Sequence, residues 1–218
     1  MNESLFALAI SSSAYSLWFI PPVAYLLGSI PFGLLIVKAS GGGDIRKTGS
    51  GNIGAANVAR NAGAIAGLLT LILDAAKGYL AVWLVARWSH DNAEWMVAAA
   101  LLAVLGHMFP IWLRFRGGKG VATGLGVFLP ICPQAVGLGV LLWLIIVIFW
   151  RYSSLGSIVA AAALPLFVYV LYAPRHAPPA LLTWGTVVVS ALIIIKHKAN
   201  IERLANGQES KLKFPGSR

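Results

Sequence analysis

Charge and cysteine are both scarce in this sequence. Asp, Glu, Lys and Arg make up 11% of its 218 residues, whereas soluble domains carry about 25%. Because 58% of the residues are hydrophobic, the chain does not hold enough polar groups to cover a fold in water. The one cysteine, Cys132, lies in an apolar stretch and cannot form an internal disulfide. These shortages exclude a soluble globular enzyme, a disulfide-rich secreted domain and a disordered tail protein.

Long charge-free runs take the place of a charged surface. They include 4–37, 95–113, 120–150 and 152–174, and several reach the roughly 20 residues with which a helix crosses a bilayer. The runs are continuous and do not alternate between polar and apolar residues, which favours helices over the strands of a membrane barrel. We therefore predict an all-α integral membrane protein, a single polytopic domain over residues 1–218 with seven transmembrane helices. The predicted spans are about 15–37, 60–87, 95–113, 121–132, 136–150, 157–173 and 179–196.

The basic residues predict how these spans are oriented. The run 120–150 is too long for one span, and Pro130 and Pro133 bracket a turn within it. With that split, 14 of the 17 Lys and Arg residues fall on one side, which the positive-inside tendency makes the cytoplasmic side. We therefore predict the amino terminus outside and the carboxyl terminus in the cytoplasm. A break of the second span between Asp74 and Lys77, which we expect to form an ion pair, would change this parity.

The first glycine-rich segment, Gly49–Arg60, reads GSGNIGAANVAR. It contains G-x-G-x-x-G literally, but a dinucleotide site needs a strand and a βαβ unit around that motif, and a helical membrane protein offers neither. Its glycine amides, the start of the following helix and the side chains of Ser50, Asn52 and Arg60 suit a bound anion. The alternative is a flexible interfacial loop that caps the second helix.

The second segment, Gly106–Thr123, reads GHMFPIWLRFRGGKGVAT. It is not a Walker A loop, because Lys119 is followed by glycine and not by Ser or Thr. A Gly-Gly-Lys-Gly turn at 117–120 that opens into a helix would still place amide donors and an ammonium around an oxyanion. The alternative is a basic loop that contacts lipid headgroups, and His107 has the alternative of a buried polar helix residue.

Two further polar segments are predicted on the same side of the membrane. Arg151–Ser157 carries hydroxyls that could bind substrate or cap the sixth helix, and Lys196–Glu209 could bind substrate or lipid headgroups. Together the four segments predict a site for phosphate-bearing substrates at the cytoplasmic interface. The four histidines form no metal-binding pattern with cysteine or carboxylates, so we expect no metal and no cofactor. The scarcity of acids argues against a phosphatidyltransferase, and a His-x4-Asp acyltransferase box is absent.

As a set, these segments resemble the motifs of the bacterial acyl-phosphate-dependent glycerol-3-phosphate acyltransferase (PlsY) family. The first segment is similar to its first motif, Leu105–Thr123 to its second, Ser154–Ser157 to its third and His197–Glu209 to its carboxyl-terminal signature. The resemblance extends in order over nearly the whole chain. One departure is Ala56, where the family usually carries Thr, so a hydroxyl donor to phosphate is missing there.

The resemblance implies a seven-helix inner-membrane enzyme that transfers a fatty acyl group from acyl phosphate to the 1-hydroxyl of glycerol 3-phosphate. The products would be lysophosphatidic acid and inorganic phosphate, in phospholipid biosynthesis. The partners would be these substrates and membrane lipid, with no nucleic acid and no obligate protein partner. Acyl phosphate is an activated mixed anhydride, so its transfer needs orientation and charge neutralisation more than a strong nucleophile.

We expect the site to consist of a catalytic set and a binding set of residues. The catalytic set is His197, Asn200 and Ser157, of which the first two would position the glycerol hydroxyl. The substrate- and phosphate-binding set is Ser50, Gly51, Asn52, Asn57, Arg60, His107, Gly117, Gly118, Lys119, Gly120, Thr123 and Arg203. Within it, His107 would buttress the loop that carries Lys119. A substrate phosphate oxygen or, alternatively, His197 would accept the proton of the hydroxyl.

Two other classes of function stay open on the sequence alone. A transporter or channel for an anionic solute would use the glycine loops as a phosphate filter, and it would need polar groups or paired broken helices within the spans. Only Asp74 and Lys77 meet that need. A non-catalytic scaffold of a lipid-synthesis complex would not need four segments suited to phosphate.

Overall fold

The computed structural model of the chain describes residues 19–172 and 179–212, and these residues form helices and connecting loops without a strand. The predicted all-α fold is therefore confirmed for this part of the chain. Residues 15–18 of the first predicted span, residue 173 of the sixth and both ends of the chain lie outside it. The helices are α2 (Ile20–Gly28), α3 (Phe32–Ala39), α4 (Ala55–Ala62), α5 (Ala64–Trp88), α6 (Ala93–Met108), α7 (Val121–Phe128), α8 (Pro133–Trp150), α9 (Ser153–Tyr172), α10 (Pro179–Lys196) and α11 (Lys198–Ala205), with 3-10 turns η1 (Ile45–Lys47) and η2 (Ile111–Leu113).

Several of these helices are long and apolar enough to cross a membrane. Four stretches qualify by themselves, namely α5, α6 extended to Leu113, α8 and α9. Two bent pairs qualify only if each pair is one span: α2 with α3, at 41°, and α10 with α11, at 58°. This pattern agrees with the predicted integral membrane protein, while seven crossings and their orientation stay predictions.

The first two predicted spans are not continuous helices, which corrects their boundaries. The first breaks between α2 and α3, where Pro31 precedes Phe32; proline lacks the N–H of a helix hydrogen bond and disfavours a helical residue before it. The second breaks at Gly63, whose φ of 92° lies in a region that L side chains rarely adopt. Residues 60–62 therefore belong to the short helix α4, and the long helix α5 begins only at Ala64.

The predicted division of the run 120–150 is confirmed, because α7 ends at Phe128 and α8 begins at Pro133. The helix within the predicted fourth span, 121–132, ends four residues short of residue 132. Helix α7 has 8 residues, which corresponds to about 12 Å of helix, well below the roughly 30 Å of a bilayer core. The predicted fourth span thus consists of this short helix and the turn at 129–132 that leads into α8.

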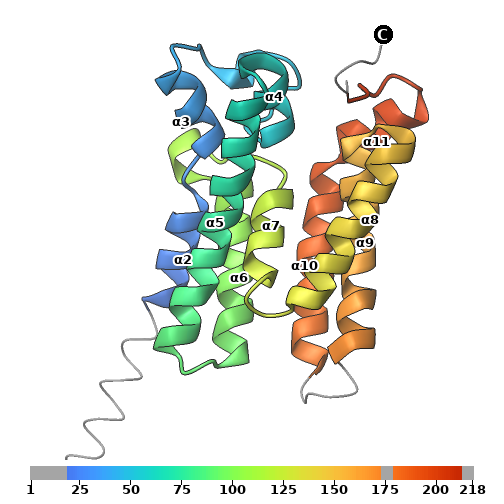
Figure 1. Cartoon of the computed structure of the whole chain (residues 1–218). Coiled ribbons are helices and arrows are strands. Elements are labelled where there is room, and N and C mark those ends of the chain that lie inside the picture. Colours follow the sequence, from blue (N-terminus) through green and yellow to red (C-terminus); the bar gives the residue numbers. More distant parts are fainter. Residues whose placement is uncertain (1–18, 173–178, 213–218) are drawn as a thin grey trace, which may run out of the picture.

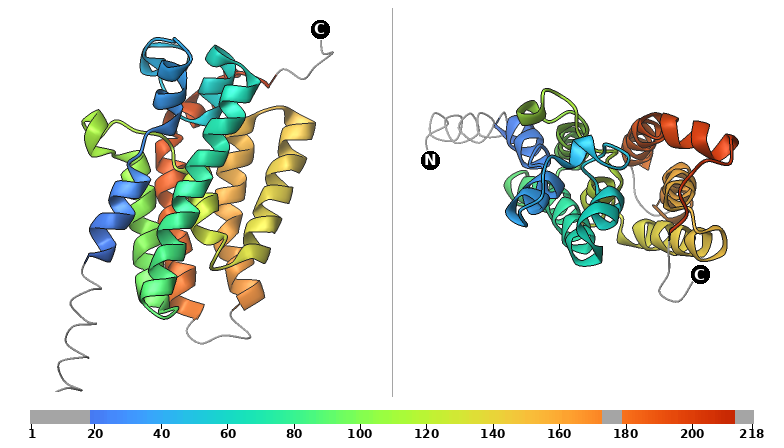
Figure 2. Two further views of the ribbon diagram at one scale, coloured as in Figure 1. Left: turned by 60° about the vertical axis from the view of Figure 1, so that its left-hand side comes forward. Right: turned by 90° about the horizontal axis from the view of Figure 1, so that it is seen from above.

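The helices form two groups that lie side by side (Figures 1 and 2). In the first helix group, α2–α7, the long α5 packs against α4, α6 and α7, and α2 packs against α6. In the second helix group, α8–α11, α9 lies between α8 and α10. The two groups meet mainly where α10 packs against α6. Buried Val104, Phe128 and Val189 belong to one apolar core that joins both groups.

The polar segments of the chain gather at one end of the bundle. The loop between α3 and α4, helix α4 and helix α11 lie at that end in Figure 1, whereas the α5–α6 turn lies at the other. Large apolar side chains such as Ile65, Phe149 and Trp184 are exposed along the sides of the helices. An apolar surface of this extent fits contact with lipid. The structure thus has an apolar belt and one polar end, and the candidate site lies at that end.

Candidate active site

Asn57 of α4 organises the first glycine-rich loop. Its side chain is buried, and its amide group donates hydrogen bonds to the carbonyls of Ile45, Thr48 and Asn52 over 3.3, 3.2 and 2.8 Å. Its side-chain oxygen accepts from the amide of Ser50 at 3.0 Å. Asn57 therefore shapes the loop from within, because its donors are taken by backbone carbonyls.

The other predicted residues of this loop lie at its surface. Ser50, Gly51 and Arg60 are exposed, and Gly51 has a φ of 70° that favours glycine. The side-chain oxygen of Asn52 accepts from the amide of Gly54 at 2.7 Å and closes a tight turn before α4. Nε of Arg60 donates to the carbonyl of residue 56 at 3.0 Å, an interaction that does not depend on whether residue 56 is Ala or Thr.

The loop that carries Lys119 folds back on the end of α6. The amides of Gly117 and Gly118 donate to the carbonyls of Met108 and His107 at 3.1 and 3.0 Å. Gly120 then turns the chain into α7 with a φ of 82°, and no side chain caps this helix. The first amides of α7 are therefore free of a side-chain partner and lie next to Lys119 in the sequence, an arrangement that favours an anion.

A hydrogen-bond network around Glu209 joins the Lys119 loop to the second helix group. Nζ of Lys119 donates to Oδ1 of Asn200 on α11, and Nδ2 of Asn200 donates to Oε1 of Glu209 at 2.7 Å. Ser154 at the start of α9 donates to the same oxygen at 2.7 Å, and Nε of Arg203 donates to Oε2 at 2.7 Å. The glutamate side chain is only 6% exposed, so it fixes α9, α11 and the Asn200 amide together.

The charges of this network set the protonation of its members. Burial lowers the pKa of Lys119 to about 8; the Glu209 carboxylate opposes the shift, and Arg203 and Arg60 add to it. Burial raises the pKa of Glu209, but hydrogen bonds from Ser154, Asn200 and Arg203 outweigh burial and hold that pKa below its usual range. Lys119 is thus a cation near neutral pH that loses its proton more readily than an exposed lysine.

His197, between α10 and α11, is a neutral imidazole above about pH 4. Burial, with a smaller contribution from the nearby Lys119 ammonium, lowers its pKa to about 4 against the opposing effects of the Ile193 carbonyl and the Glu209 carboxylate. Nδ1 lies 2.8 Å from the carbonyl oxygen of Ile193. Because a carbonyl can only accept, Nδ1 carries the proton and Nε2 is the acceptor. The ring can therefore accept a hydrogen bond from a substrate hydroxyl.

The structure brings together only part of the predicted set. Lys119, Asn200, Arg203 and His197 form one group, and Arg60 is near enough to lower the pKa of Lys119.

Thr123 is not in this group: its hydroxyl is fully buried between α5 and α7 and donates to the Asp74 carbonyl at 3.1 Å. The hydroxyl of Ser157 is also buried and donates to the Ser153 carbonyl of its own helix at 2.9 Å. The ring of His107 lies inside the bundle beneath the Lys119 loop.

Glu209 and Ser154 are the members that the predicted site set did not include. Both stand in the segments that resemble family motifs, but hydroxyls and acids near helix ends are common and have many uses. The signal that could have identified Glu209 is its rarity, because it is one of 7 acidic residues in a chain with 17 basic ones. An acid inside a basic tail is expected to have a partner there.

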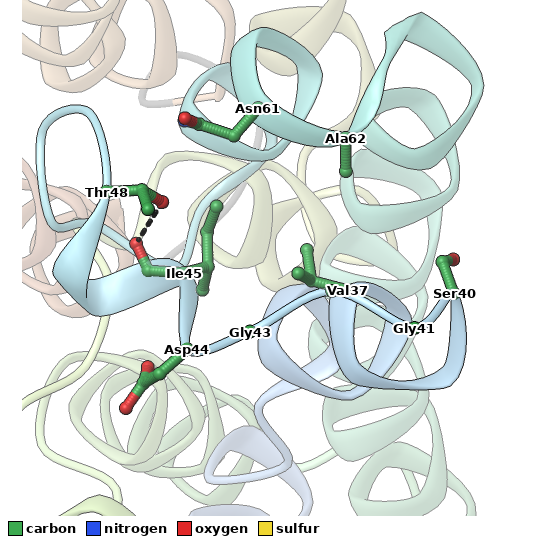
Figure 3. A pocket seen from close by; sticks show the side chains of 10 residues that line it. Val37, Ser40, Gly41, Gly43, Asp44, Ile45, Thr48, Asn61 and Ala62 are labelled. Atoms are coloured by element: carbon green, nitrogen blue, oxygen red, sulfur yellow. Dashed lines mark hydrogen bonds between the residues drawn. The ribbon is translucent and has the colours of Figure 1, made fainter.

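A pocket of about 350 Å³ opens at the same end of the bundle, between the end of α3, η1 and α4 (Figure 3). None of the predicted site residues lines it. Its carboxylate, Asp44, is ion-paired with Arg46 at 2.7 Å, and hydrogen bonds from Arg46 lower the pKa of Asp44 to about 2. A permanent negative charge does not suit phosphate. Within residues 19–172 and 179–212, no three His, Cys, Asp or Glu side chains form a group that could hold a metal ion.

An apolar groove of about 560 Å³ runs between α5 and α7. Helix α7 starts directly after Lys119 and Gly120, so the groove begins a few residues along this helix from the Lys119 loop. Its walls hold no polar surface and are formed by Ile72, Ala75, Ala76, Tyr79, Leu80, Leu125, Gly126 and Leu129.

The chain matches one family of known proteins over most of its length. The family profile described as glycerol-3-phosphate acyltransferase matches residues 18–207. A glycerol-3-phosphate acyltransferase of Geobacter sulfurreducens is 51% identical over 191 residues, which are 88% of this chain and 95% of the relative. The protein of the same name from Mesorhizobium japonicum is 47% identical over 192 residues, 88% of this chain and 94% of the relative.

Two solved structures have the same fold. Both are crystal structures of PlsY (YgiH), an integral membrane glycerol 3-phosphate acyltransferase, in its glycerol 3-phosphate form and its lysophosphatidic acid form. They are 41% and 40% identical to this chain, with TM-scores of 0.84 and 0.82, and each comparison covers 91% of this chain and 96% of the other. The similarity in sequence and the similarity in fold lead to the same conclusion. The chain belongs to the PlsY family of glycerol-3-phosphate acyltransferases.

Proposed function

We propose that this protein transfers a fatty acyl group from an acyl phosphate to the 1-hydroxyl of glycerol 3-phosphate. The products are lysophosphatidic acid and inorganic phosphate. The names of the relatives support glycerol 3-phosphate as the acceptor. The observation that carries the proposal is the contact between Lys119 and Asn200 beside the neutral imidazole of His197. It supports the proposal because a cation that can bind phosphate and an acceptor that can bind a hydroxyl lie in one group at the polar end.

The cations of this group and the uncapped amides at the start of α7 bind phosphate in this proposal. Lys119 and the amides at the start of α7 provide the central donors, and Arg60 and Arg203 add positive charge from two other elements. Ser50, Gly51 and Asn52 form the exposed side of the first loop, where their polar groups can reach a bound phosphate. Although Glu209 is ion-paired with Arg203, the group keeps a net positive charge, which favours phosphate.

The reaction needs little from the protein beyond placement of these groups. The 1-hydroxyl oxygen attacks the acyl carbon, the bond between that carbon and the phosphate oxygen breaks, and inorganic phosphate leaves. The proton of the hydroxyl goes to a phosphate oxygen of a substrate, with Nε2 of His197 as the alternative acceptor. Lys119 stabilises the negative charge that develops on the acyl oxygen and on the leaving phosphate. No covalent acyl-enzyme is required, and the buried Cys132 is not placed to form one.

The acyl chain lies, in this proposal, in the apolar groove between α5 and α7. The groove is open to the sides of the bundle, where the surface is apolar, and it lies on the helix that follows the Lys119 loop. At about 1.5 Å per helical residue, Leu125 lies roughly 9 Å along α7 from Lys119. A chain whose phosphate is bound at Lys119 can therefore enter the groove directly.

The charge distribution supports a membrane setting in which the polar end faces the cytoplasm. We infer seven crossings in the inner membrane of a bacterium, with the amino terminus outside and the carboxyl terminus and active site at the cytoplasmic face. The supporting observation is that α4, α11 and the α3–α4 loop, which carry many of the basic residues, lie at one end of the bundle (Figure 1). Basic residues favour the cytoplasmic side, where water-soluble glycerol 3-phosphate is available.

The direct test supplies purified protein with palmitoyl phosphate and labelled glycerol 3-phosphate. We expect lysophosphatidic acid and inorganic phosphate in equal amounts, and a Lys119→Ala variant purified in parallel should lose about 100-fold or more in rate. Product from palmitoyl-CoA but not from palmitoyl phosphate would overturn the donor. Absence of product from both donors would overturn the reaction, and full activity of Lys119→Ala would remove the role of the Lys119 loop.

The groove assignment has its own test, which narrows the groove at its α5 wall. Ala76→Phe should lower kcat/KM for palmitoyl phosphate by about tenfold, because about 0.8 kcal/mol is lost for each methylene that is no longer buried. The effect on butyryl phosphate should be much smaller. Leu144→Phe on the exposed face of α8 is the matched control. Equal losses for both chain lengths would show that the chain lies elsewhere.

A further inference from the structure

A buried charged cluster lies inside the first helix group, beneath the Lys119 loop. It consists of Asp74 and Lys77 on α5 and His107 on α6, whose side chains are 3%, 2% and 4% exposed. Oδ1 of Asp74 lies 2.7 Å from Nζ of Lys77, which confirms the ion pair expected from their spacing. A buried ion pair adds little net stability, because the desolvation of both charges offsets their attraction. Stability alone therefore gives no reason for charges at this depth in a membrane protein.

Contacts of the cluster residues reach the α2–α3 break, α6 and α7. Nζ of Lys77 donates to the carbonyl of Ile30 at 2.7 Å, at the break between α2 and α3. The backbone carbonyl of Asp74 accepts from the hydroxyl of Thr123 on α7 at 3.1 Å. Oδ1 of Asp74 also lies 3.6 Å from Nδ1 of His107 on α6. The ion pair thus links α5 to the α2–α3 break and lies beside α6, while the backbone of the same turn of α5 binds α7 just below the loop.

His107 passes this constraint to the loop itself. Its carbonyl accepts the amide of Gly118 at 3.0 Å, and its ring lies against the same glycine. A Cβ atom added to Gly118 would lie 2.0 Å from Nε2 of His107, so the ring fills the space on that side of the loop. Because glycine has no side chain to hold its own conformation, the position of Gly118 depends on these contacts, and Lys119 is the next residue.

We propose that the Asp74–Lys77 pair is a positioning device for the phosphate-binding loop, acting through His107 on Gly118 and so on Lys119. The Asp74 carboxylate lies on one side of the imidazole, 3.6 Å from Nδ1, and the imidazole supports the loop on its other side, as outer partners orient the groups that bind a ligand. Neither residue touches substrate, and no proton is transferred. The inference rests on the proposed function, in which this loop holds the phosphate of a substrate.

The inference predicts a defect in binding of glycerol 3-phosphate more than in turnover. This substrate has no apolar part, so its affinity comes largely from its phosphate contacts, whereas acyl phosphate also has its chain. We expect Asp74→Asn/Lys77→Met to raise the KM for glycerol 3-phosphate by about tenfold while changing kcat by no more than about threefold. Both charges are removed together because a single substitution leaves an unpaired buried charge and can prevent folding.

The matched control is Thr70→Val, also on α5. The Thr70 hydroxyl is fully buried but donates only to the Ala66 carbonyl of its own helix, at 2.8 Å. It should leave the KM unchanged. A wild-type KM in Asp74→Asn/Lys77→Met, with normal folding, would show that the pair is not a positioning device.

A double-mutant cycle between Gly118 and His107 tests the connecting step. Gly118→Ala should be strongly impaired, because its Cβ collides with the His107 ring. Removal of the ring in Gly118→Ala/His107→Ala should relieve the collision, so that the double variant is no worse than His107→Ala alone. Additive losses would show that the ring does not hold the loop, and this would overturn the proposal.

A binding measurement separates this inference from the proposed reaction. Glycerol 3-phosphate should raise the melting temperature of the wild-type protein, since a ligand that binds only the folded state stabilises it, and the shift should shrink in Asp74→Asn/Lys77→Met. Suppose that the wild type forms no product but its melting temperature rises with glycerol 3-phosphate, and that Asp74→Asn/Lys77→Met loses this rise. The positioning role is then supported and the proposed reaction is contradicted. If product forms and the two shifts are equal, the reaction holds and the positioning role falls. If Asp74→Asn/Lys77→Met does not fold, product formation and the shift in melting temperature are measured instead on His107→Asn, which keeps both charges.

Discussion

Lys119 is a cation whose charge depends on its surroundings. Burial brings its pKa to about 8, so the protonated fraction falls as the pH rises through 8. We therefore expect kcat/KM for glycerol 3-phosphate to decline above about pH 8, because the neutral amine no longer attracts phosphate. A pH profile from 6 to 10 with purified protein measures this decline.

The control for that profile is Lys119→Arg. A guanidinium stays protonated over this whole range, while the ionisation of the substrate phosphate is the same for both proteins. The variant should be less active at neutral pH, because its planar fork does not match the contact that Lys119 makes with Asn200, but its profile should be flat where the wild type declines. An equal decline in both proteins would assign the titration to another group.

His197 allows the two proton acceptors to be distinguished. Its Nε2 can accept a hydrogen bond, and its pKa of about 4 makes it a weak base. A His197→Gln variant keeps an acceptor for the hydroxyl but cannot take a proton. If a substrate phosphate takes the proton, we expect kcat to fall by less than about tenfold; loss of a general base costs about 100-fold or more. Single-turnover rates with saturating substrates measure the difference.

Helices α5 and α7 approach so closely that only glycine fits at their contact. A Cβ atom on Gly126 would lie 1.9 Å from the carbonyl oxygen of Ala75. Gly126→Ala should therefore push α7 away and destabilise the protein by about 1–3 kcal/mol, which corresponds to a fall in melting temperature of roughly 2–4 °C per kcal/mol. Because α7 also carries the Lys119 loop, activity should fall with it. Thermal unfolding and the acyltransfer assay measure both effects.

The same substitution at Gly137 on α8 is the control for Gly126→Ala. No atom lies within 4 Å of the Cβ position there, and alanine in a helix is favoured over glycine by about 0.5–1 kcal/mol. Gly137→Ala should leave the melting temperature unchanged or slightly raised. A similar loss at both positions would attribute the effect to helix propensity or to the detergent and not to the contact.

The elements show where sequence reasoning succeeds and where it fails. Pro130 and Pro133 predicted the division between α7 and α8, because proline acts locally on the backbone. Charge-free length did not predict that α7 is short, since an apolar turn and an apolar helix have the same hydropathy. The break at Gly63 was missed because a glycine in an apolar run is compatible with a continuous helix, and only the packing of α4 requires the turn.

The candidate site shows the same limit at longer range. The spacing of Asp74 and Lys77 predicted an ion pair within one helix. No local pattern predicts that Asn200 bridges Lys119 and Glu209, because these residues meet only when the two helix groups pack together. Thr123 was expected near phosphate because it follows a glycine-lysine turn, but the close contact of α5 and α7 takes its hydroxyl into the bundle.

Over the whole molecule, the two helix groups are joined at the polar end by few polar contacts. Lys119 reaches Asn200, and Nζ of Lys196 on α10 lies 3.5 Å from the Met108 carbonyl and 4.6 Å from the centre of the Phe109 ring. Both contacts place a lysine of one group against the other group. The site therefore forms only when the two groups are packed, which explains why its residues come from segments that lie far apart in the sequence.

The net charge of +10 belongs to the topology of the whole molecule as much as to the site. If the polar end faces the cytoplasm, the α5–α6 turn faces outside and the segment after α11 faces inside.

Cys132 is the one cysteine and is fully buried, so Cys132→Ala provides a background for single cysteines at two exposed positions. In intact cells, a membrane-impermeant maleimide should label Glu94→Cys, at the start of α6, but not Ser210→Cys, after α11. Permeabilised cells should show both labels. Labelling of Ser210→Cys alone in intact cells would invert the topology, and labelling of both would place the two ends on one side and give an even number of crossings between them.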